Sequence, residues 1–325
     1  MDNRKIKPPK HTRRPATSRD SQEQKVIPNN LSVRGAVFCE EYEFLSGHKV
    51  PIYEVTSVHA LSQIIGHAKF NNQAYGNIFC RGECKLHDSL KLSLFRTRKN
   101  IEVATSHVTQ LIQKISSDSH MTNDLKLGKY REEQKRHVIE GVLQHYGIST
   151  RFIDIVDNHW VALWMGLNRI EKSKQINTYY HYFERYIPLA QGSLEGQDYY
   201  QYILLIAVPF STKPITMGIS ESKEYVMVDL RQALPSVFLR PHAQHGLIVR
   251  KKVAPPCTPE SYDMAPNVVG IIKIRIDRVK EWIGTGELLT QDNLFPSPAF
   301  DYGYDLLLKR NDLFEEEEFQ IAKFV

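Results

Sequence analysis

Three short stretches of this sequence concentrate side chains that could do chemistry. In the first, IFCRGE (78–83), Arg81 ends a strand-like run and Gly82 follows it. Arginine suits bidentate contact with a phosphate or carboxylate, and a glycine beside it lets a bound group approach the backbone. An arginine tied to an internal carboxylate such as Asp154 would leave the same pattern. The stretch is therefore either part of an anion site or an internal ion pair.

The second stretch, LQHYGISTRFID (143–154), sets a dense group of polar residues next to an apolar helix. Its polar members are Gln144, His145, Tyr146, Thr150, Arg151 and Asp154. Polar groups are costly to bury unless they find hydrogen-bond partners or a ligand. They therefore either hold two parts of the fold together or line a pocket.

The third stretch is LRPHAQHGLIVRK (239–251), in which Gln244, His245 and Gly246 lead directly into a strand-like run. These residues are candidates for a binding site, and the simplest alternative is that they form a polar turn. Elsewhere the sequence lacks G-x-G-x-x-G, the P-loop, H-E-x-x-H and G-x-S-x-G, which argues against Rossmann, P-loop, zinc-protease and α/β-hydrolase chemistry. The four cysteines form neither a disulfide framework nor a zinc motif, so we expect no metal.

The hydrophobic pattern indicates which elements carry these stretches. Apolar residues at helical spacing predict helices over 57–70, 101–115, 132–146 and 158–170, the last capped by Asp157. Runs rich in β-branched and aromatic residues predict strands over 49–55, 77–83, 199–210, 224–230, 245–251 and 267–276. Helices followed by strands are typical of an α+β fold with a largely antiparallel sheet.

The charge of the chain is unevenly placed. Residues 1–35 hold nine Lys/Arg and three Asp/Glu, whereas the remainder is close to neutral. This composition predicts a disordered basic arm over 1–32, followed by a single domain over 33–325. Such an arm can attract nucleic acid, contact an acidic protein, or be a solvated leader without a partner. No window is apolar enough to span a membrane and no secretory signal opens the chain, so we expect a cytoplasmic protein.

Taken in order, FCRGE, LSLFR, LQHYGISTRFIDIVDNHWVALWMG and AQHGLIV resemble the FRG domain family. That family carries a Phe/Trp-Arg-Gly motif, an LxPSLFR-like stretch, a QHYGxPTRLLDWT-like core and a late QxG before a strand. The resemblance covers about residues 75–250. Cys80 stands in the aromatic position, Ser149 replaces the usual Pro, and Ile155-Val156 replaces Trp-Thr. None of these departures removes a strongly polar candidate.

The resemblance implies a bacterial protein of toxin–antitoxin or phage-defence settings that is distantly related to ADP-ribosyltransferases. Those enzymes bind NAD in a cleft between a helical part and a split sheet, so we expect a split, largely antiparallel sheet and a helical N-terminal half. The expected co-substrate is NAD. The expected acceptor is nucleic acid, with RNA favoured over DNA, and the expected partner is a neutralising antitoxin protein. Contact with a membrane is not expected.

The resemblance also assigns roles to individual residues. Those assigned to catalysis are Arg81, His145, Tyr146 and Gln244, and those assigned to NAD binding are Arg81, Gly82, Gln144, Thr150, Arg151, Asp154 and His245. Arg81 would hold a phosphate or the ribose, while His145 and Tyr146 would contact the nicotinamide ribose or stack on its ring. Thr150 and Arg151 would complete the anion site.

Two of these assignments concern how carboxylates are used. Asp154 would orient Arg151, and Gln244 would occupy the position where many transferases carry a glutamate that touches the ribose hydroxyls. Glutamine can hydrogen-bond hydroxyls but cannot supply negative charge or act as a base. Glu83 or Asp154 would then have to supply that charge.

Two other functions stay open at this point. In a non-catalytic nucleic-acid-binding or sensing module, the polar residues of 143–154 would be structural. A nuclease would need clustered carboxylates, and the motifs offer only Glu83, Asp88, Asp154 and Asp157 without a recognisable spacing. The enzyme hypothesis requires Arg81, the 144–154 segment and Gln244 to converge on one cleft.

Overall fold

The computed structural model describes residues 23–96, 101–172, 179–185, 199–254, 257–284, 286, 288–310, 312–314 and 320–324. In this part of the chain, nine strands form one sheet in the order β1-β2-β11-β7-β3-β4-β10-β9-β8, and a smaller sheet has the order β12-β6-β5. All neighbours in the large sheet are antiparallel except β2 and β11. The expected α+β class with a largely antiparallel sheet is confirmed.

Strands and helices are interspersed along the chain, with a run of helices between β3 and β4 and a run of strands from β5 to β9. The strands are β1 (Ala36–Glu43), β2 (Lys49–Val55), β3 (Gly76–Glu83), β4 (Ile153–Val156), β5 (Asn168–Lys172), β6 (Tyr179–Glu184), β7 (Tyr200–Pro209), β8 (Ile219–Glu221), β9 (Tyr225–Asp229), β10 (Gly246–Lys251), β11 (Val268–Arg275) and β12 (Lys323–Phe324). The α-helices are α1 (Val58–Asn71), α2 (Ser93–Arg96), α3 (Ile101–Ser117), α4 (Ser119–Asp124), α5 (Glu132–His145), α6 (His159–Leu167), α7 (Leu230–Ala233), α8 (Leu239–Ala243), α9 (Ile276–Ile283), α10 (Gln291–Leu294) and α11 (Tyr302–Lys309). Short 3-10 helices are η1 (Leu127–Lys129), η3 (Glu260–Tyr262) and η4 (Ala265–Asn267).

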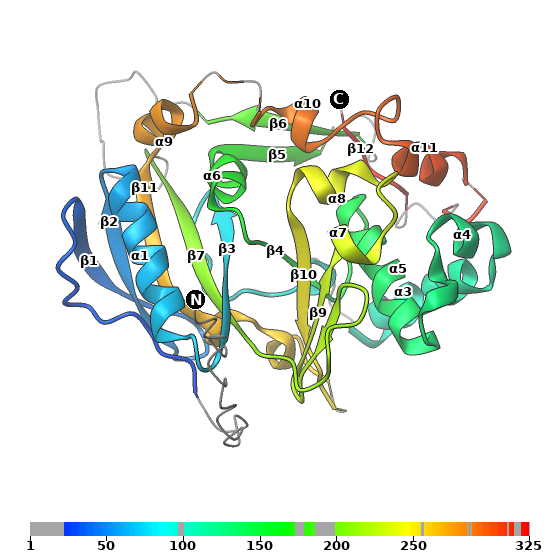
Figure 1. Cartoon of the computed structure of the whole chain (residues 1–325), viewed down its shortest axis with the longest axis horizontal. Coiled ribbons are helices and arrows are strands. Elements are labelled where there is room, and N and C mark those ends of the chain that lie inside the picture. The colour runs from blue at the N-terminus through cyan, green and yellow to red at the C-terminus, as the bar shows by residue number, and fades with distance from the viewer. Residues whose placement is uncertain are drawn as a thin grey trace, which may run out of the picture.

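Helices cover both faces of the large sheet, so its central strands are apolar on both sides. Along β7, Leu204 and Ile206 point into a core shared with α3 and α5, whereas Ile203 and Leu205 point into a core shared with α1 and α6. This alternation follows from the two-residue period of a strand. Figure 1 shows α1 in front of β2 and β11, and α3, α4 and α5 grouped beside β9 and β10.

The pairing between neighbouring strands of the large sheet is shortest at its middle, between β3 and β4. β3 pairs with β7 over eight residues, Gly76 to Glu83, but with β4 only through Cys80 and Val156 in the described chain. On one side of this contact, β3 runs on through Arg81 to Glu83 while β4 holds Asp154 and Ile155. Gly82 also packs closely against α6, and a Cβ added at this position would lie 1.9 Å from the Ala162 carbonyl oxygen. Glycine is therefore required for β3 to approach this helix.

The order of elements differs from expectation in the first part of the chain. Strands β1, β2 and β3 precede the helices α3 to α5, and together with β7 and β11 they form one half of the large sheet. The cap of α6 is also not the predicted Asp157. Asn158 precedes the helix, and its side chain accepts a 2.9 Å bond from the Trp160 N–H. The helix then ends at Leu167, because β5 begins at the next residue.

The described portion of the predicted basic arm packs against the domain. Ile27 is 3% exposed, and its N–H donates to the Val269 carbonyl at 2.8 Å. The Tyr53 hydroxyl donates to the Pro28 carbonyl at 2.6 Å. Residues 25–31 are thus part of the folded unit, and residues 1–22 of the arm lie outside the described residues. Among the described helices, none combines the length and the apolar character needed to cross a membrane.

Candidate functional site

A cavity of about 560 Å³ opens where β3 and β4 diverge, within the range of roughly 300–1,000 Å³ common for small-molecule sites. We call it the junction cavity. Its walls come from residues 80–85 of β3 and the turn after it, from 154–156 of β4, and from α6 and β5. The charged side chains that line it are Arg81, Lys85, Arg96, Arg169, Arg185, Glu83 and Asp154. Cations therefore outnumber carboxylates, as an anion site requires.

Arg81 is held by two bonds and keeps its charge. Its Nε donates to Glu83 Oε1 at 2.6 Å, and its Nη1 donates to the Asp154 carbonyl oxygen at 2.8 Å. Burial alone would lower the pKa of Arg81, but the Glu83 and Asp154 carboxylates outweigh it and raise that pKa. Within the described part of the chain, Nη2 has no hydrogen-bond partner. The guanidinium is thus fixed in direction and still has donors for a ligand.

Arg96 places a second guanidinium on the same cavity. Its Nε donates to the Lys91 carbonyl at 3.0 Å. Burial and, next, the charge of Arg81 lower the pKa of Arg96, so the two cations repel each other. A bound anion would relieve that repulsion. The sequence pattern does not single out Arg96, although it is the last residue of the LSLFR motif.

The cavity has other cationic residues that the sequence motifs do not single out. Arg169 lies on β5 and Arg185 follows β6, and Arg185 Nη1 donates to the Tyr200 carbonyl at 3.1 Å. Lys85 follows β3. These residues belong to no recognised motif. The only sequence signal was their positive charge, which is not specific enough to identify a site.

Asp154 presents a carboxylate whose direction is set by Gln144. The Asp154 Oδ2 accepts a 2.8 Å bond from Gln144 Nε2, and the Asp154 side chain is still 44% exposed. The Gln144 oxygen accepts in turn from the hydroxyls of Thr150 at 2.7 Å and Ser93 at 3.1 Å. Because two hydroxyls point at the oxygen of this amide, its nitrogen must face Asp154. Gln144 and Thr150 therefore orient the carboxylate from behind.

His145 lies behind Asp154, outside the lining of the junction cavity. Its Nε2 is 3.7 Å from Asp154 Oδ1, longer than a hydrogen bond, and its side chain is 3% exposed. Burial lowers the pKa of His145, which favours the neutral ring. Gly246 packs on this ring, since a Cβ there would be 2.2 Å from Cε1. The predicted contact of His145 with a bound ribose is replaced by packing beneath β10.

Tyr146 was predicted to touch the nicotinamide ribose, but the structure gives it a buried position. The side chain is 0% exposed, and its hydroxyl donates to Asp301 Oδ2 at 2.7 Å. The Arg240 guanidinium stacks on its ring at 4.6 Å from the centroid. Burial raises the pKa of Tyr146 well above its ordinary value. Neither the ring nor the hydroxyl is accessible to a ligand.

Arg151 was predicted to be oriented by Asp154, and this pairing is wrong. Its carboxylate partner is Glu140 of α5, which is completely buried. The Arg151 Nε and Nη2 each donate to this carboxylate at 2.8 Å, and the Arg151 backbone N–H adds a bond of 2.9 Å. Burial alone would raise the pKa of Glu140, but Arg151 holds it below its ordinary value. The pair ties the segment before β4 to α5, and neither residue lines the junction cavity.

Gln244 does not lie on the junction cavity either. It follows α8, it is 6% exposed, and its amide donates to the Leu294 carbonyl at 2.7 Å. The expected convergence thus brings Arg81, Gly82 and Asp154 together and leaves Gln244 apart.

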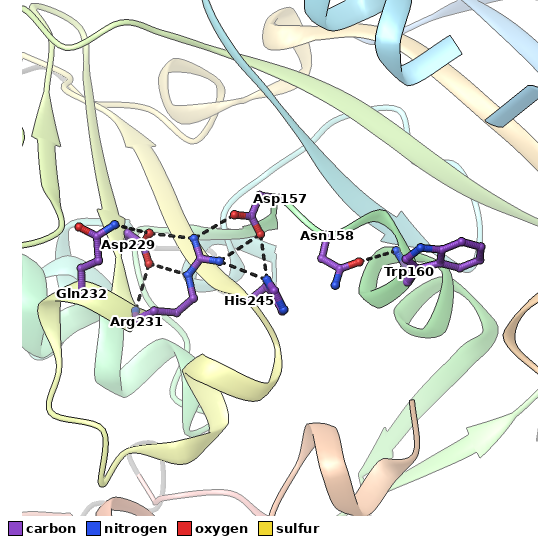
Figure 2. Close-up of polar contacts among 7 residues, drawn as sticks. All are labelled: Asp157, Asn158, Trp160, Asp229, Arg231, Gln232 and His245. Atoms are coloured by element: carbon purple, nitrogen blue, oxygen red, sulfur yellow. Dashed lines mark hydrogen bonds and ion pairs between the residues drawn. The ribbon is translucent and has the colours of Figure 1, made fainter. Parts of the chain in front are cut away.

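His245 belongs to a separate polar cluster at the other end of β4. Figure 2 shows its ring beside Asp157, with the Arg231 guanidinium between Asp157 and Asp229. The His245 Nδ1 is 3.2 Å from Asp157 Oδ1, and Arg231 donates to both carboxylates. The backbone φ of His245 is +50°, which is uncommon for a residue other than glycine. His245 is not among the residues that line the junction cavity.

Comparison with known proteins adds one finding. Residues 76–175 match the family model of the FRG domain, which supports the resemblance of this chain to that family. The segment contains Arg81, Arg96 and Asp154, and it ends well before Gln244. No curated protein and no solved structure matches the chain. Within the described residues, no group of three His, Cys, Asp or Glu side chains is arranged to hold a metal ion.

Proposed function

We propose that this protein is an NAD-dependent ADP-ribosyltransferase and that NAD binds in the junction cavity. The observation that carries the proposal is the pair of guanidiniums, Arg81 and Arg96, on a cavity that also presents the Asp154 carboxylate. NAD carries a pyrophosphate, which needs cations. Its nicotinamide ribose becomes positively charged as the glycosidic bond breaks, which favours a nearby carboxylate. The cavity offers both.

The narrow contact between β3 and β4 supports the split sheet that the family resemblance implies. With Cys80 and Val156 as the only described residue pair, the sheet divides into β1-β2-β11-β7-β3 and β4-β10-β9-β8. Arg81 and Gly82 come from the first half, and Asp154 comes from the second. A ligand at this point contacts both halves, as NAD does in the cleft of an ADP-ribosyltransferase.

In the proposed reaction, Arg81 and Arg96 bind the pyrophosphate. The bond between C1′ of the ribose and the nicotinamide nitrogen breaks, and its electron pair leaves with nicotinamide. Asp154 stabilises the positive charge at C1′ and takes the proton that the acceptor loses as it bonds to C1′. We assign this role to Asp154 because Glu83 is engaged by Arg81 at 2.6 Å, whereas Asp154 Oδ1 makes no hydrogen bond within the described chain.

The proposed acceptor is nucleic acid, with RNA favoured over DNA. Its support is the excess of cations around the junction cavity together with the family resemblance. A role as a toxin in antiviral defence, neutralised by an antitoxin protein in the cytoplasm, rests on the resemblance alone.

The test uses NAD labelled on its adenylate phosphate and the purified full chain. It is incubated with RNA, with single-stranded DNA and with lysate proteins, and both transferred label and free nicotinamide are measured. Asp154→Asn should lower transfer about 100-fold or more, the usual scale for losing a group that stabilises transition-state charge. Arg96→Ala should weaken NAD binding. Arg136→Ala, an exposed arginine of α5 outside the cavity, is the matched control and should change neither.

Two results would overturn this function. If folded protein shows no NAD binding by calorimetry, the cavity has another ligand. If NAD binds but no acceptor takes label and no nicotinamide is released, a non-catalytic sensing module replaces the enzyme.

A further inference from the structure

A second cavity, of about 390 Å³, lies between the start of α5 and the segment that leads into β8. It shares no lining residue with the junction cavity. Its charged lining residues are Lys129, Arg131, Lys213 and Glu221. We propose that this second cavity binds backbone phosphates of a single-stranded nucleic acid.

The only carboxylate among the described lining residues is already neutralised. The Glu221 side chain is 7% exposed, and its Oε2 lies 2.7 Å from Lys252 Nζ and 3.4 Å from Lys213 Nζ. Burial alone would raise the pKa of Glu221, but the two lysines hold it below its ordinary value. Lys129 and Arg131 are therefore not compensated by this carboxylate. Their charges stay available to an anion in the cavity.

The two walls of the second cavity are fixed to each other. The Tyr130 hydroxyl lies 2.8 Å from the Met217 carbonyl oxygen and 2.9 Å from that of Ala233, so it joins the segment before α5 to the segment before β8. The Lys129 ammonium sits over the Tyr130 ring at 5.1 Å from its centroid. The Arg131 N–H donates to Gln134 Oε1 at 3.2 Å. The cations thus lie on a concave surface whose two walls are held together by hydrogen bonds.

The placement of the cations favours an extended polyanion over a small enclosed one. The Lys213 side chain is 68% exposed, so positive charge stands at the rim as well as inside. The same segment exposes Ile215 by 64% and Met217 by 45%, which offers apolar contact to unpaired bases. Cations that track a backbone beside a surface that bases can touch are typical of single-strand binding. A free phosphate would use only part of this surface.

The proposal deepens the function above by giving the nucleic-acid acceptor a docking site away from the chemistry. It rests on that function only for its biological purpose, because the binding itself requires no NAD. The two can therefore fail separately.

The test is fluorescence anisotropy of labelled single-stranded RNA and DNA oligonucleotides with the full chain, without NAD, over a series of salt concentrations. The double substitution Lys129→Ala and Arg131→Ala should raise Kd about 10-fold or more at moderate salt. It should also reduce the slope of log K against log salt by about 1.4, since each of the two lost phosphate contacts on a single strand contributes roughly 0.7. Arg136→Ala, at an exposed arginine of α5 that does not line the second cavity, should leave both quantities unchanged.

Circular dichroism and a urea midpoint would show that the double variant folds. Equal RNA affinity in the double variant and the unchanged protein would overturn the site. So would pyrophosphate binding at this cavity with no oligonucleotide binding at all, since it would indicate a small-anion ligand. Oligonucleotide binding that persists in Asp154→Asn, together with absent transfer in the unchanged protein, would retain this site and remove only the enzyme.

Discussion

The junction cavity and the layer of buried charge behind it, formed by Glu140, Arg151 and His137, both include residues of the 143–154 stretch. We call the second region the buried layer. The charged groups of the two regions have different partners and different exposure. In the buried layer, Glu140 accepts three bonds from Arg151, at 2.8 to 2.9 Å, and is fully buried. At the junction cavity, Asp154 is held by one bond from Gln144 and is 44% exposed. Polar residues close together in sequence thus fall into two sets. The charges of one set are paired within the protein, and those of the other remain available to a ligand.

This difference in burial and pairing separates charged residues that stabilise the fold from those that can act in binding or catalysis. A buried ion pair that loses one partner leaves an uncompensated charge away from water, which is strongly destabilising. When an exposed carboxylate loses a contact, water takes the place of that contact at little cost in free energy. Substitutions in the buried layer should therefore lower the free energy of unfolding, whereas substitutions at the cavity should lower ligand binding or turnover.

The largest expected loss of stability comes from Glu140→Gln. This change leaves Arg151 without its carboxylate and removes the charge that offsets Arg250 nearby. The free energy of unfolding should fall by about 3 kcal/mol or more, the range for breaking a buried pair. Urea denaturation measures it, and the exposed Glu133→Gln on the same helix should change it by less than about 0.5 kcal/mol. A small loss in Glu140→Gln would remove the distinction between the two regions.

A smaller effect is expected from acid, through His137 of the buried layer. Burial, with Arg250 next to the ring, lowers the pKa of His137 to about 4. Because the unfolded chain takes up this proton near pH 6.5 and the folded chain does not, stability is complete above that pH and falls as the pH drops toward 4. Between pH 7.5 and 4.5 the loss from this group should be about 2 to 3 kcal/mol.

The measurement compares urea midpoints at the two pH values in the unchanged protein and in His137→Gln. The variant should lose less stability on acidification, whereas His120→Gln, at an exposed histidine, should keep the full dependence. Equal acid sensitivity in all three proteins would show that His137 is not the group responsible.

The sequence predicted the elements better than it predicted the roles of their side chains. The helix beginning after Ser57 and the strand ending at Glu83 follow from local periodicity and capping, and both are confirmed. The placement of Arg81 and Asp154 on one cavity depends on β3 meeting β4, a contact between distant segments. The family motif carried that information, since local patterns do not.

The roles predicted for Tyr146, Arg151 and Gln244 differ from the structure for a common reason. Each finds its partner in a residue that the motifs do not mention, respectively Asp301, Glu140 and Leu294. A sequence shows that a polar side chain needs a partner, but it does not show whether the partner is a ligand or a distant part of the chain. Burial decides this, and burial is a property of the whole fold.

The smallest expected effect on stability is the most informative about function. Asp154→Asn keeps the shape of a half-exposed side chain and retains an oxygen that can accept from Gln144 Nε2, so unfolding should change by no more than about 0.5 kcal/mol. The same variant should lose ADP-ribosyl transfer, because the amide carries no negative charge to stabilise the ribose. Urea denaturation and the labelled-NAD assay, run on one preparation, test both statements. A fall in stability comparable to that of Glu140→Gln would place Asp154 with the structural charges, and the junction cavity would then lose the carboxylate that its proposed chemistry needs.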